Sequence, residues 1–481
     1  MYFNLDQYRS FLNYTLNNKK FLLNHPLNQP IETGEIAASL RRSQEIQLTS
    51  YEKKWFRLIS KDLYRLGLTD SITKSGRWNL GVNAVQRLSS QNSKQYGEYR
   101  VELYGIYQLP YLVFVNRTVT DQSYKKDPNY FGDTGEWIYG RVEDAYGKLQ
   151  YKALALFGGR ISRNFGMFEE VSLIFSDNPY SFDNFGFILN TSHVYFCYYC
   201  GRLNNLISID SQADNAELVN ATRYFSIQRG TIRISDKYHI GLTQTALYGG
   251  EDKQLEFYYL NPLNLYYIEQ RNNRSQMNGF WAVEFFWNPS SKFSWYTQWL
   301  IDDVIVNNEP GQNDRSEYPD RMGITSKMIF TDCLGSGSML DLTYTQIGNW
   351  TYMSFRTWEN YTYSGQCLGY PENSVETFGI QYKNFSRPPF LPEIYLRYRR
   401  HGTQDINEVY GSMREKFPRG IVENSFCTGL KLLYMPSNKF FVKIQTEYNS
   451  IKNLSNIEGR KKENYSVTLS LFVNMDSRFA F

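Results

Sequence analysis

The chain has 481 residues and a net charge of only +4, without a dominant basic block, so a nucleic-acid-binding protein is not favoured. It contains 40 Tyr, 32 Phe and 9 Trp, yet its mean hydropathy is -0.52. No run approaches the roughly 18 uninterrupted apolar residues of a membrane-spanning helix, which excludes helical membrane insertion. Abundant aromatics with low mean hydropathy are typical of a membrane β-barrel, whose lipid face is apolar only at alternate positions.

Residues 1–70 have a helical pattern. Thr49 and Glu52 form a capping box, and the residues that follow recur at mostly helical spacing until Gly67: Trp55, Leu58, Ile59, Asp62, Leu63 and Leu66. A second helix is predicted from Thr33 and a third within residues 4–23. We therefore expect residues 1–70 to form a helical periplasmic segment.

The first residues do not combine a basic stretch with an apolar one, as a signal peptide would. For a mature chain, this means that the signal peptide has been removed. A complete gene product without one would count against a membrane location.

From Trp78 onward the pattern has a period of two residues: Leu80, Val82 and Ala84 alternate with polar partners. Trp137, Tyr139 and Arg141 alternate with their neighbours in the same way. The last seventeen residues alternate most clearly, with these residues on one face: Tyr465, Val467, Leu469, Leu471, Val473, Met475, Ser477, Phe479 and Phe481. A strand this long and apolar is a poor edge for a soluble sheet, but a closed barrel in lipid has no edge. The final aromatic also resembles the carboxy-terminal signature of bacterial outer-membrane barrels. The alternative is a sandwich strand that ends the chain.

The connections between these strands alternate in length. Long connections are expected at 118–134, 163–182, 204–222, 249–278, 304–320, 347–373, 401–424 and 452–463. Short ones are expected near Pro110 and at 144–148, 189–192, 235–237, 288–292, 333–338, 386–392 and 436–439, with a modest one at 89–95. Outer-membrane barrels have short periplasmic turns and long outer loops, whereas a sandwich has no reason to alternate them. The sequence predicts a mainly β protein, a closed antiparallel transmembrane β-barrel of about eighteen strands over residues 77–481.

The sequence gives little support for a catalytic site or a metal site. The four histidines are not at metal-ligand spacing, and hydrolase, nucleotide-binding and metalloprotease fingerprints do not occur. Asp302 and Asp303 are adjacent on a strand and should point to opposite faces, which prevents them from acting on one bond. We expect no enzyme, no cofactor and no metal. A hydrolase with a Ser–His pair on neighbouring strands is a lesser alternative.

The five cysteines do not indicate a redox or zinc site. Cys197 and Cys200 lie in one predicted strand and should point to opposite faces. A disulfide between Cys367 and Cys427 is conceivable in an oxidising compartment.

The richest outer loop spans residues 348–363. It interleaves aromatic rings with charged groups, a mixture that suits sugars because their CH faces stack on rings and their hydroxyls bind polar side chains. The candidate polysaccharide-binding residues are Trp350, Tyr352, Arg356, Trp358, Tyr361 and Tyr363. The alternative is that these residues serve as an interfacial aromatic girdle and as loop packing.

Several short motifs spread over the chain resemble the capsule assembly Wzi family. They are Thr343-Tyr-Thr-Gln346, Asn349-Trp-Thr-Tyr352, Tyr363-Ser-Gly-Gln-Cys-Leu-Gly369, Gly158-Gly-Arg160 with Gly166, Leu173-Ile-Phe-Ser-Asp-Asn178, Leu300-Ile-Asp-Asp303, Gly34-Glu-Ile36 and Leu48-Thr-Ser-Tyr-Glu52. The resemblance implies an eighteen-stranded outer-membrane barrel with a periplasmic helical bundle and a lectin-like role in retaining capsular polysaccharide. It does not assign a sugar contact to any numbered position.

The partners expected from this resemblance are capsular or surface polysaccharide, outer-membrane lipid and, during folding, the barrel assembly machinery. Nucleic acid is not expected. The main alternative function is that of an outer-membrane porin or transporter for small solutes, which would need an open lumen lined by opposed charges.

Overall fold

The computed structural model describes residues 6–43, 47–65, 76–92, 94–135, 139–209, 218–273, 277–303, 321–408, 410–411 and 415–480. The barrel strands are β1 (Arg77–Gln91), β2 (Lys94–Gln108), β3 (Leu112–Asp121), β4 (Gly140–Tyr151), β5 (Leu154–Arg160), β6 (Asp183–Asn190), β7 (Val194–Arg202), β9 (Leu218–Ser235), β10 (Tyr238–Gly250), β11 (Asn278–Ser290), β12 (Phe293–Asp303), β13 (Arg321–Thr331), β14 (Ser338–Ile347), β17 (Val375–Asn384), β18 (Phe390–His401), β19 (Glu423–Tyr434), β20 (Phe440–Lys452) and β21 (Lys461–Ala480). Two short hairpin strands, β15 (Thr362–Tyr363) and β16 (Gln366–Cys367), pair with each other, and β8 (Leu206–Ile209) pairs with β9.

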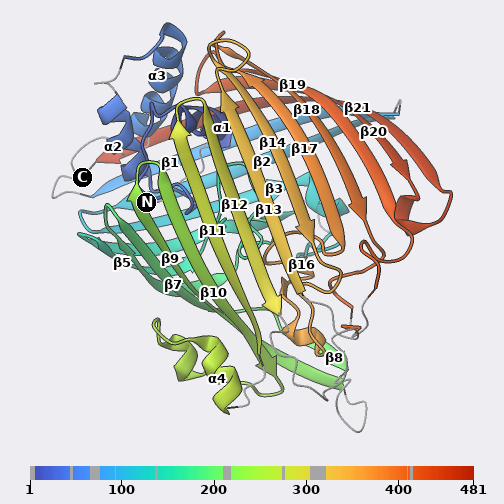
Figure 1. The fold of residues 1–481 in the computed structure, drawn as a ribbon. Helices are drawn as coiled ribbons and strands as arrows, with labels where there is room; N and C mark the ends of the chain where they lie inside the picture. The colour runs from blue at the N-terminus through green and yellow to red at the C-terminus, as the bar shows by residue number, and fades with distance from the viewer. Residues whose placement is uncertain are drawn as a thin grey trace.

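The helices are α1 (Asp6–Asn17), α2 (Thr33–Ser43), α3 (Ser50–Arg65) and α4 (Tyr266–Asn273), with the 3-10 turns η1 (Gln122–Lys126), η2 (Phe257–Leu260), η3 (Thr357–Glu359) and η4 (Leu454–Asn456). Figure 1 shows α1, α2 and α3 at one end of the barrel and α4 at the other. Among the described residues, no helix is long and apolar enough to cross a membrane.

The sheet closes on itself because β1 pairs with β2 on one side and with β21 on the other, each time antiparallel. Eighteen strands of the described chain form the ring, since β8 pairs only with β9 and stands outside it. The predicted closed antiparallel barrel is confirmed, including its strand number. Closure gives every strand two neighbours, so no edge has to be protected in lipid.

The alternation along β21 sorts its side chains as the sequence indicated. Met475 is 58% exposed on the outer face, while Ser470 is 7% exposed on the inner face. Val467, Val473 and Phe479 are exposed on the same outer face as Met475. The apolar face is therefore the lipid face, and the fold with its apolar belt is that of an integral outer-membrane protein.

The amino-terminal helices begin where the sequence predicts. At the start of α3, the backbone N–H of Thr49 donates to the carboxylate of Glu52 at 2.8 Å, and the N–H of Glu52 lies 3.4 Å from the Thr49 hydroxyl. This is the reciprocal capping box. The helix α2 starts at Thr33 as expected, whereas residues 66–75, including Leu66 and Gly67, lie outside the described residues.

The helices dock on the short turns of the barrel. Trp55 of α3 is buried and donates its indole N–H to the carbonyl of Phe385 at 3.0 Å. Tyr14 of α1 donates its hydroxyl to Asp332 at 2.9 Å. The buried apolar faces of α1, α2 and α3 join one core with side chains of the barrel wall, such as Met339. The helices therefore cover the short-turn end of the barrel by packing as well as by hydrogen bonds.

A second segment enters the lumen from the outer side and meets the amino-terminal segment. This inner loop, residues 161–182, connects β5 and β6. Its Asn164 forms a two-way backbone bridge with Gln29, with both N–O distances at 3.0 Å. Its Glu169 lies 2.6 Å from the Lys383 ammonium on the wall and 3.1 Å from the Asn13 amide of α1. Two segments far apart in sequence thus form one plug across part of the lumen.

The electrostatics of this plug favour a charged Glu169. Although burial raises the pKa of Glu169, the ammonium groups of Lys383 and Lys327 lower it below its usual range. A second ion pair of the plug joins Glu32 of the amino-terminal segment to Lys148 of β4 at 2.5 Å. The lumen is polar but its charges are largely matched, as burial requires.

Short and long connections alternate as predicted, with one error. Residues 144–148 are not a turn but the middle of β4, and the turn comes at residues 152–153. Asp144 and Lys148 are polar because they face the lumen, where they pair with Arg117 at 2.8 Å and with Glu32. Their polarity resembled that of a surface turn. Trp137, Phe481 and the long connection 304–320 lie outside the described residues.

The disulfide considered from the sequence is not formed. All five cysteines are free, with Cys367 buried in the inward-folded segment before β17 and Cys427 in β19. Cys197 and Cys200 of β7 are both buried, although they face opposite sides of the wall. Cys200 can be buried on the outer side because the connection that carries α4 covers it, through Tyr198 and Tyr266.

Candidate functional site

A groove of about 700 Å³ lies at the outer end of β11, β12 and β13. One wall is the connection that carries α4, and the other is the segment 354–359 that ends in η3. Figure 1 shows α4 at the barrel end opposite the amino-terminal helices, which places this groove at the end that carries the long connections. Its volume falls in the roughly 300–1,000 Å³ range of small-molecule sites.

The α4 wall is fixed to the outside of the barrel by polar side chains of the strands. Gln228 of β9 donates to the carbonyl of Asn261 at 3.0 Å, and Gln244 of β10 donates to the carbonyl of Asn264 at 2.7 Å. Tyr198 of β7 donates its hydroxyl to the carbonyl of Tyr259 at 3.0 Å. Polar side chains at outward-facing strand positions would be energetically unfavourable in lipid. The connection that carries α4 accepts their hydrogen bonds, and the same bonds hold the connection on the barrel wall.

The floor of the groove is set by the acidic pair at the end of β12. Asp302 is buried and accepts the backbone N–H of Tyr352 at 2.8 Å, while Asp303 is exposed. Arg321 lies 3.4 Å from Asp302 and 3.2 Å from Asp303. The two carboxylates differ in burial, but one guanidinium bridges them, because the strand register shifts between Ile301 and Asp303. Among the described residues, no group of three acidic, His or Cys side chains is placed to hold a metal ion.

Aromatic rings and charged groups lie together in the groove. Phe355 is 42% exposed and Tyr267 is 50% exposed, and both line it. Arg356 and Glu359 line the same groove, and their charged groups are 3.7 Å apart. Ser354 donates its hydroxyl to Glu359 at 2.8 Å. Flat apolar surface beside hydrogen-bonding groups is what a sugar ring with its hydroxyls requires.

Four of the six candidate residues from the sequence are packing residues. Tyr352 and Tyr361 are fully buried, and Trp350 and Trp358 are 3% exposed. These four rings are closed in by neighbouring side chains, so they do not form an open stacking surface. Arg356 lines the groove and is half-buried. Tyr363 is also half-buried, against Phe182 at a ring separation of 5.1 Å.

The buried rings of Tyr352 and Tyr361 attach the segment between β14 and β17 to the inner loop, residues 161–182. Tyr352 donates its hydroxyl to the carbonyl of Leu173 at 2.6 Å, and Tyr361 donates to the carbonyl of Ile174 at 2.6 Å. The two rings stack with centroids 5.9 Å apart. They therefore position the segment 354–359 indirectly, by fixing the loop on either side of it.

Arg223 of β9 is a functional residue that sequence reasoning missed. Its guanidinium is fully buried and donates to the carbonyls of Trp358 at 2.7 Å, Asn360 at 2.8 Å and Thr362 at 2.8 Å. This single side chain holds the segment after the groove against the barrel wall. The available signal was a charged residue at an inward-facing position of a predicted strand, which requires a buried partner.

The fold resembles solved outer-membrane proteins. Wzi of Escherichia coli, described as an outer-membrane protein involved in group 1 capsule assembly and as a carbohydrate-binding β-barrel, matches with a TM-score of 0.65. The match is 13% identical and covers 97% of this chain and 98% of that one. It shows that the two chains share a fold over nearly their whole length.

Weaker likenesses are found among other barrels. OccD3 of Pseudomonas aeruginosa matches with a TM-score of 0.49 and 11% identity, over 85% of this chain and 96% of that one. OccAB3 of Acinetobacter baumannii matches with a TM-score of 0.47 and 10% identity, over 84% and 99%. No protein-family model matches the sequence. No curated protein matches it either.

Proposed function

We propose that this barrel binds surface or capsular polysaccharide and holds it at the cell surface in a lectin-like manner. The observation that carries the proposal is the groove on the outer side, where Phe355 and Tyr267 are exposed beside Arg356 and Glu359. The likeness to Wzi, a barrel described as carbohydrate-binding, supports the same function.

The plugged lumen favours retention over passage of solutes. The helices pack across the periplasmic end, and the inner loop meets them at Gln29 and Glu169. A diffusion channel needs a continuous aqueous path, so the alternative function of a porin predicts a large and steady conductance. Retention predicts a low one.

Within the groove, Phe355 and Tyr267 stack on sugar rings, and Arg356 binds hydroxyl or carboxylate oxygens. The other candidate residues from the sequence act by holding the loop in shape, with Tyr363 at its edge. Each aromatic contact contributes roughly 0.5–1.5 kcal/mol, so single sugar units bind weakly. Repetition of the polymer unit against many copies of the protein makes retention firm.

The test compares Phe355→Ala with Tyr267→Ala, singly and together, in cells that lack the wild-type gene. Phe257→Ala is the matched control, because Phe257 is an 85% exposed ring on the same outer connection but does not line the groove. Loss of both stacking contacts corresponds to about 1–3 kcal/mol, or roughly 5- to 150-fold weaker binding of a sugar unit.

We expect the double variant to lose surface-retained polysaccharide while the control keeps it, with normal barrel folding in both. Purified polysaccharide from the same cells should bind the wild-type protein in detergent and bind the double variant less. Equal retention by the double variant and the wild type would show that this groove is not the site. A steady large conductance in planar bilayers, with no polysaccharide binding, would instead establish a channel.

A further inference from the structure

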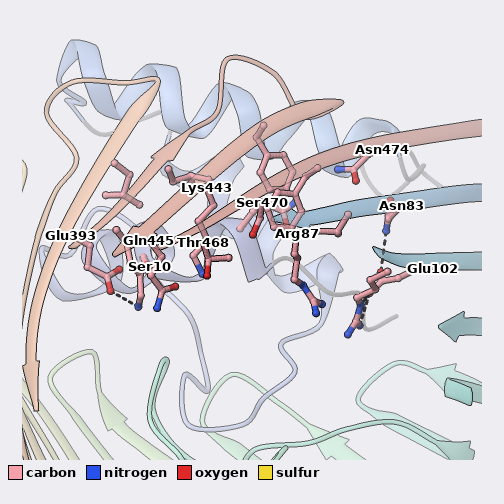
Figure 2. A pocket seen from close by; sticks show the side chains of 18 of the residues that line it. Ser10, Asn83, Arg87, Glu102, Glu393, Lys443, Gln445, Thr468, Ser470 and Asn474 are labelled. Carbon is pink, nitrogen blue, oxygen red and sulfur yellow. Dashed lines mark hydrogen bonds and ion pairs between the residues drawn. The ribbon is translucent and has the colours of Figure 1, made fainter. Parts of the chain in front are cut away.

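A second cavity lies inside the barrel, apart from the outer groove. It measures about 660 Å³ and is bounded by β1, β2, β3 and β17 to β21, with Gln7 and Ser10 of α1 on the periplasmic side. Figure 2 shows that the labelled side chains of these strands point into it. The plug fills the opposite part of the lumen and leaves this part empty of protein.

The cavity is reached from the cell exterior. Along β21 the inward-facing Asn474 and Ser470 are buried, while Thr468, Ser466 and Asn464 are half-buried as the strand runs back toward its outer end. The periplasmic end is closed by the packed helices. A ligand would therefore enter from outside and stop above α1.

One part of the lining is apolar and flat. Only Phe472 offers a ring face to this cavity: it is half-buried, and it stacks on Phe441, which is 6% exposed, with centroids 4.3 Å apart and ring planes 13° apart. Leu391 and Leu433 lie in the same lining. Neutral polar side chains surround this platform, among them Gln381, Gln445 and Ser470. Such a combination offers stacking for a ring and hydrogen bonds for its hydroxyls.

The lining of this cavity contains one more basic side chain than its ion pairs use. Four of its five basic side chains have an acidic partner: Arg87 with Asp121 at 2.9 Å, Arg100 with Glu102 at 2.6 Å, Arg117 with Asp144 at 2.8 Å and Lys431 with Glu393 at 2.6 Å. The lining carboxylate Glu169 is paired with Lys383. Within the described part of the chain, Lys443 has no ion-pair or hydrogen-bond partner at the distances that define these contacts.

Lys443 lies where the apolar part of the lining meets the polar part. It lies on β20 two residues after Phe441 and two before Gln445, and it stands opposite Ser470 of β21 in the strand register. Figure 2 shows Lys443, Gln445 and Ser470 facing the cavity, and Phe441 is also part of its lining. The half-buried ammonium of Lys443 interacts with the cations Lys431 and Arg87 and with one carboxylate, that of Glu393, so a bound anion stabilises it. A ligand with one negative charge would therefore complement the charge of this cavity.

We propose that this cavity binds a sugar acid, with its ring against the half-buried Phe472 and its carboxylate on Lys443. The neutral polar side chains bind the ring hydroxyls. The volume is within the roughly 300–1,000 Å³ range of small-ligand sites. This site is separate from the outer groove and does not depend on the function proposed for that groove.

The test uses glucuronate as the probe, with glucose and acetate as probes that lack the carboxylate and the ring, respectively. Binding to the full-length protein in detergent is followed by saturation-transfer NMR titration. Glucuronate should bind more tightly than either control probe. Lys443→Gln should weaken it by about 10- to 100-fold, the usual effect of losing one hydrogen bond to a charged group. Lys443→Arg should restore most of the binding.

The matched control is Lys237→Gln, which removes the same charge from an exposed periplasmic turn. The loss of glucuronate binding caused by Lys443→Gln should be the same in the wild-type background and in the Phe355→Ala background, so failure at either site is distinguishable from failure at the other. Equal binding of glucuronate and glucose, or equal affinity of Lys443→Gln and Lys237→Gln, would overturn the proposal. A poly-glucuronate chain that binds while free glucuronate does not would also overturn it, because the cavity is argued to hold a single sugar acid.

Discussion

Replacement of Arg223 by Met should release the loop that carries the outer groove without opening the barrel wall. The Arg223 guanidinium makes three charge-assisted hydrogen bonds to the carbonyls of Trp358, Asn360 and Thr362. Each such bond contributes about 1.5–3 kcal/mol, but the three act as one network and do not add fully. Met has a similar length and leaves the three buried carbonyls without this donor.

We expect the local opening free energy of the loop to fall by about 3–5 kcal/mol, which is roughly a 150- to 4,000-fold loss of protection from hydrogen exchange. The amides to follow are those of Tyr361 and Leu368, which are bonded to Tyr352 and Tyr361 within the loop. Amides of the strand pair β20 and β21 serve as the internal reference, because they lie elsewhere in the barrel.

The matched control is Arg202→Met on the neighbouring strand β7, where the side chain is exposed and bonds only to Asn205 among the partners that the structure describes. Unchanged exchange at Tyr361 and Leu368 in Arg223→Met would refute the reasoning. So would the same increase in both variants.

Two further predictions concern the helical segment. Trp55→Ala should weaken docking of α3 by about 3–5 kcal/mol, because it removes a buried ring and leaves the carbonyl of Phe385 without its donor. In detergent, protease should then cleave residues 6–65 faster in this variant than in Lys54→Ala, a control at an exposed site. Equal cleavage rates in the two variants would contradict this prediction. Burial raises the pKa of Glu35 to about 7, against the backbone N–H of Asn24 that donates to its carboxylate at 2.6 Å. Since the folded pKa lies above the unfolded value of 4.5, the folded state binds more protons in between, and this stability is complete at low pH and is lost as pH rises through about 7. The protection of α2 from hydrogen exchange, corrected for the intrinsic rate, should be higher at about pH 5 than at about pH 8. Glu35→Gln should remove this difference. If the pH dependence remains in Glu35→Gln, it belongs to another titrating group.

Much of the barrel could be predicted because its determinants are local. The alternation in β21 needs only the two-residue period of a strand, and the capping box at Thr49 and Glu52 needs only three residues of spacing. The failure at Asp144 and Lys148 has the same origin. A lumenal strand with polar residues looks like a turn until the distant partners Arg117 and Glu32 are known.

The sequence by itself determined the barrel, its lipid face and its number of strands, since these follow from the order of polar and apolar residues along the chain. Only the tertiary structure decided that Tyr352 and Tyr361 are buried while Phe355 is exposed, because the same aromatic loop suits either a solvent surface or a packed interior. The choice depends on partners far away in sequence, namely the carbonyls of Leu173 and Ile174 and the guanidinium of Arg223. The unpartnered Lys443 has the same explanation, because a matched or unmatched charge in a lumen is a property of the assembled ring and not of any one strand.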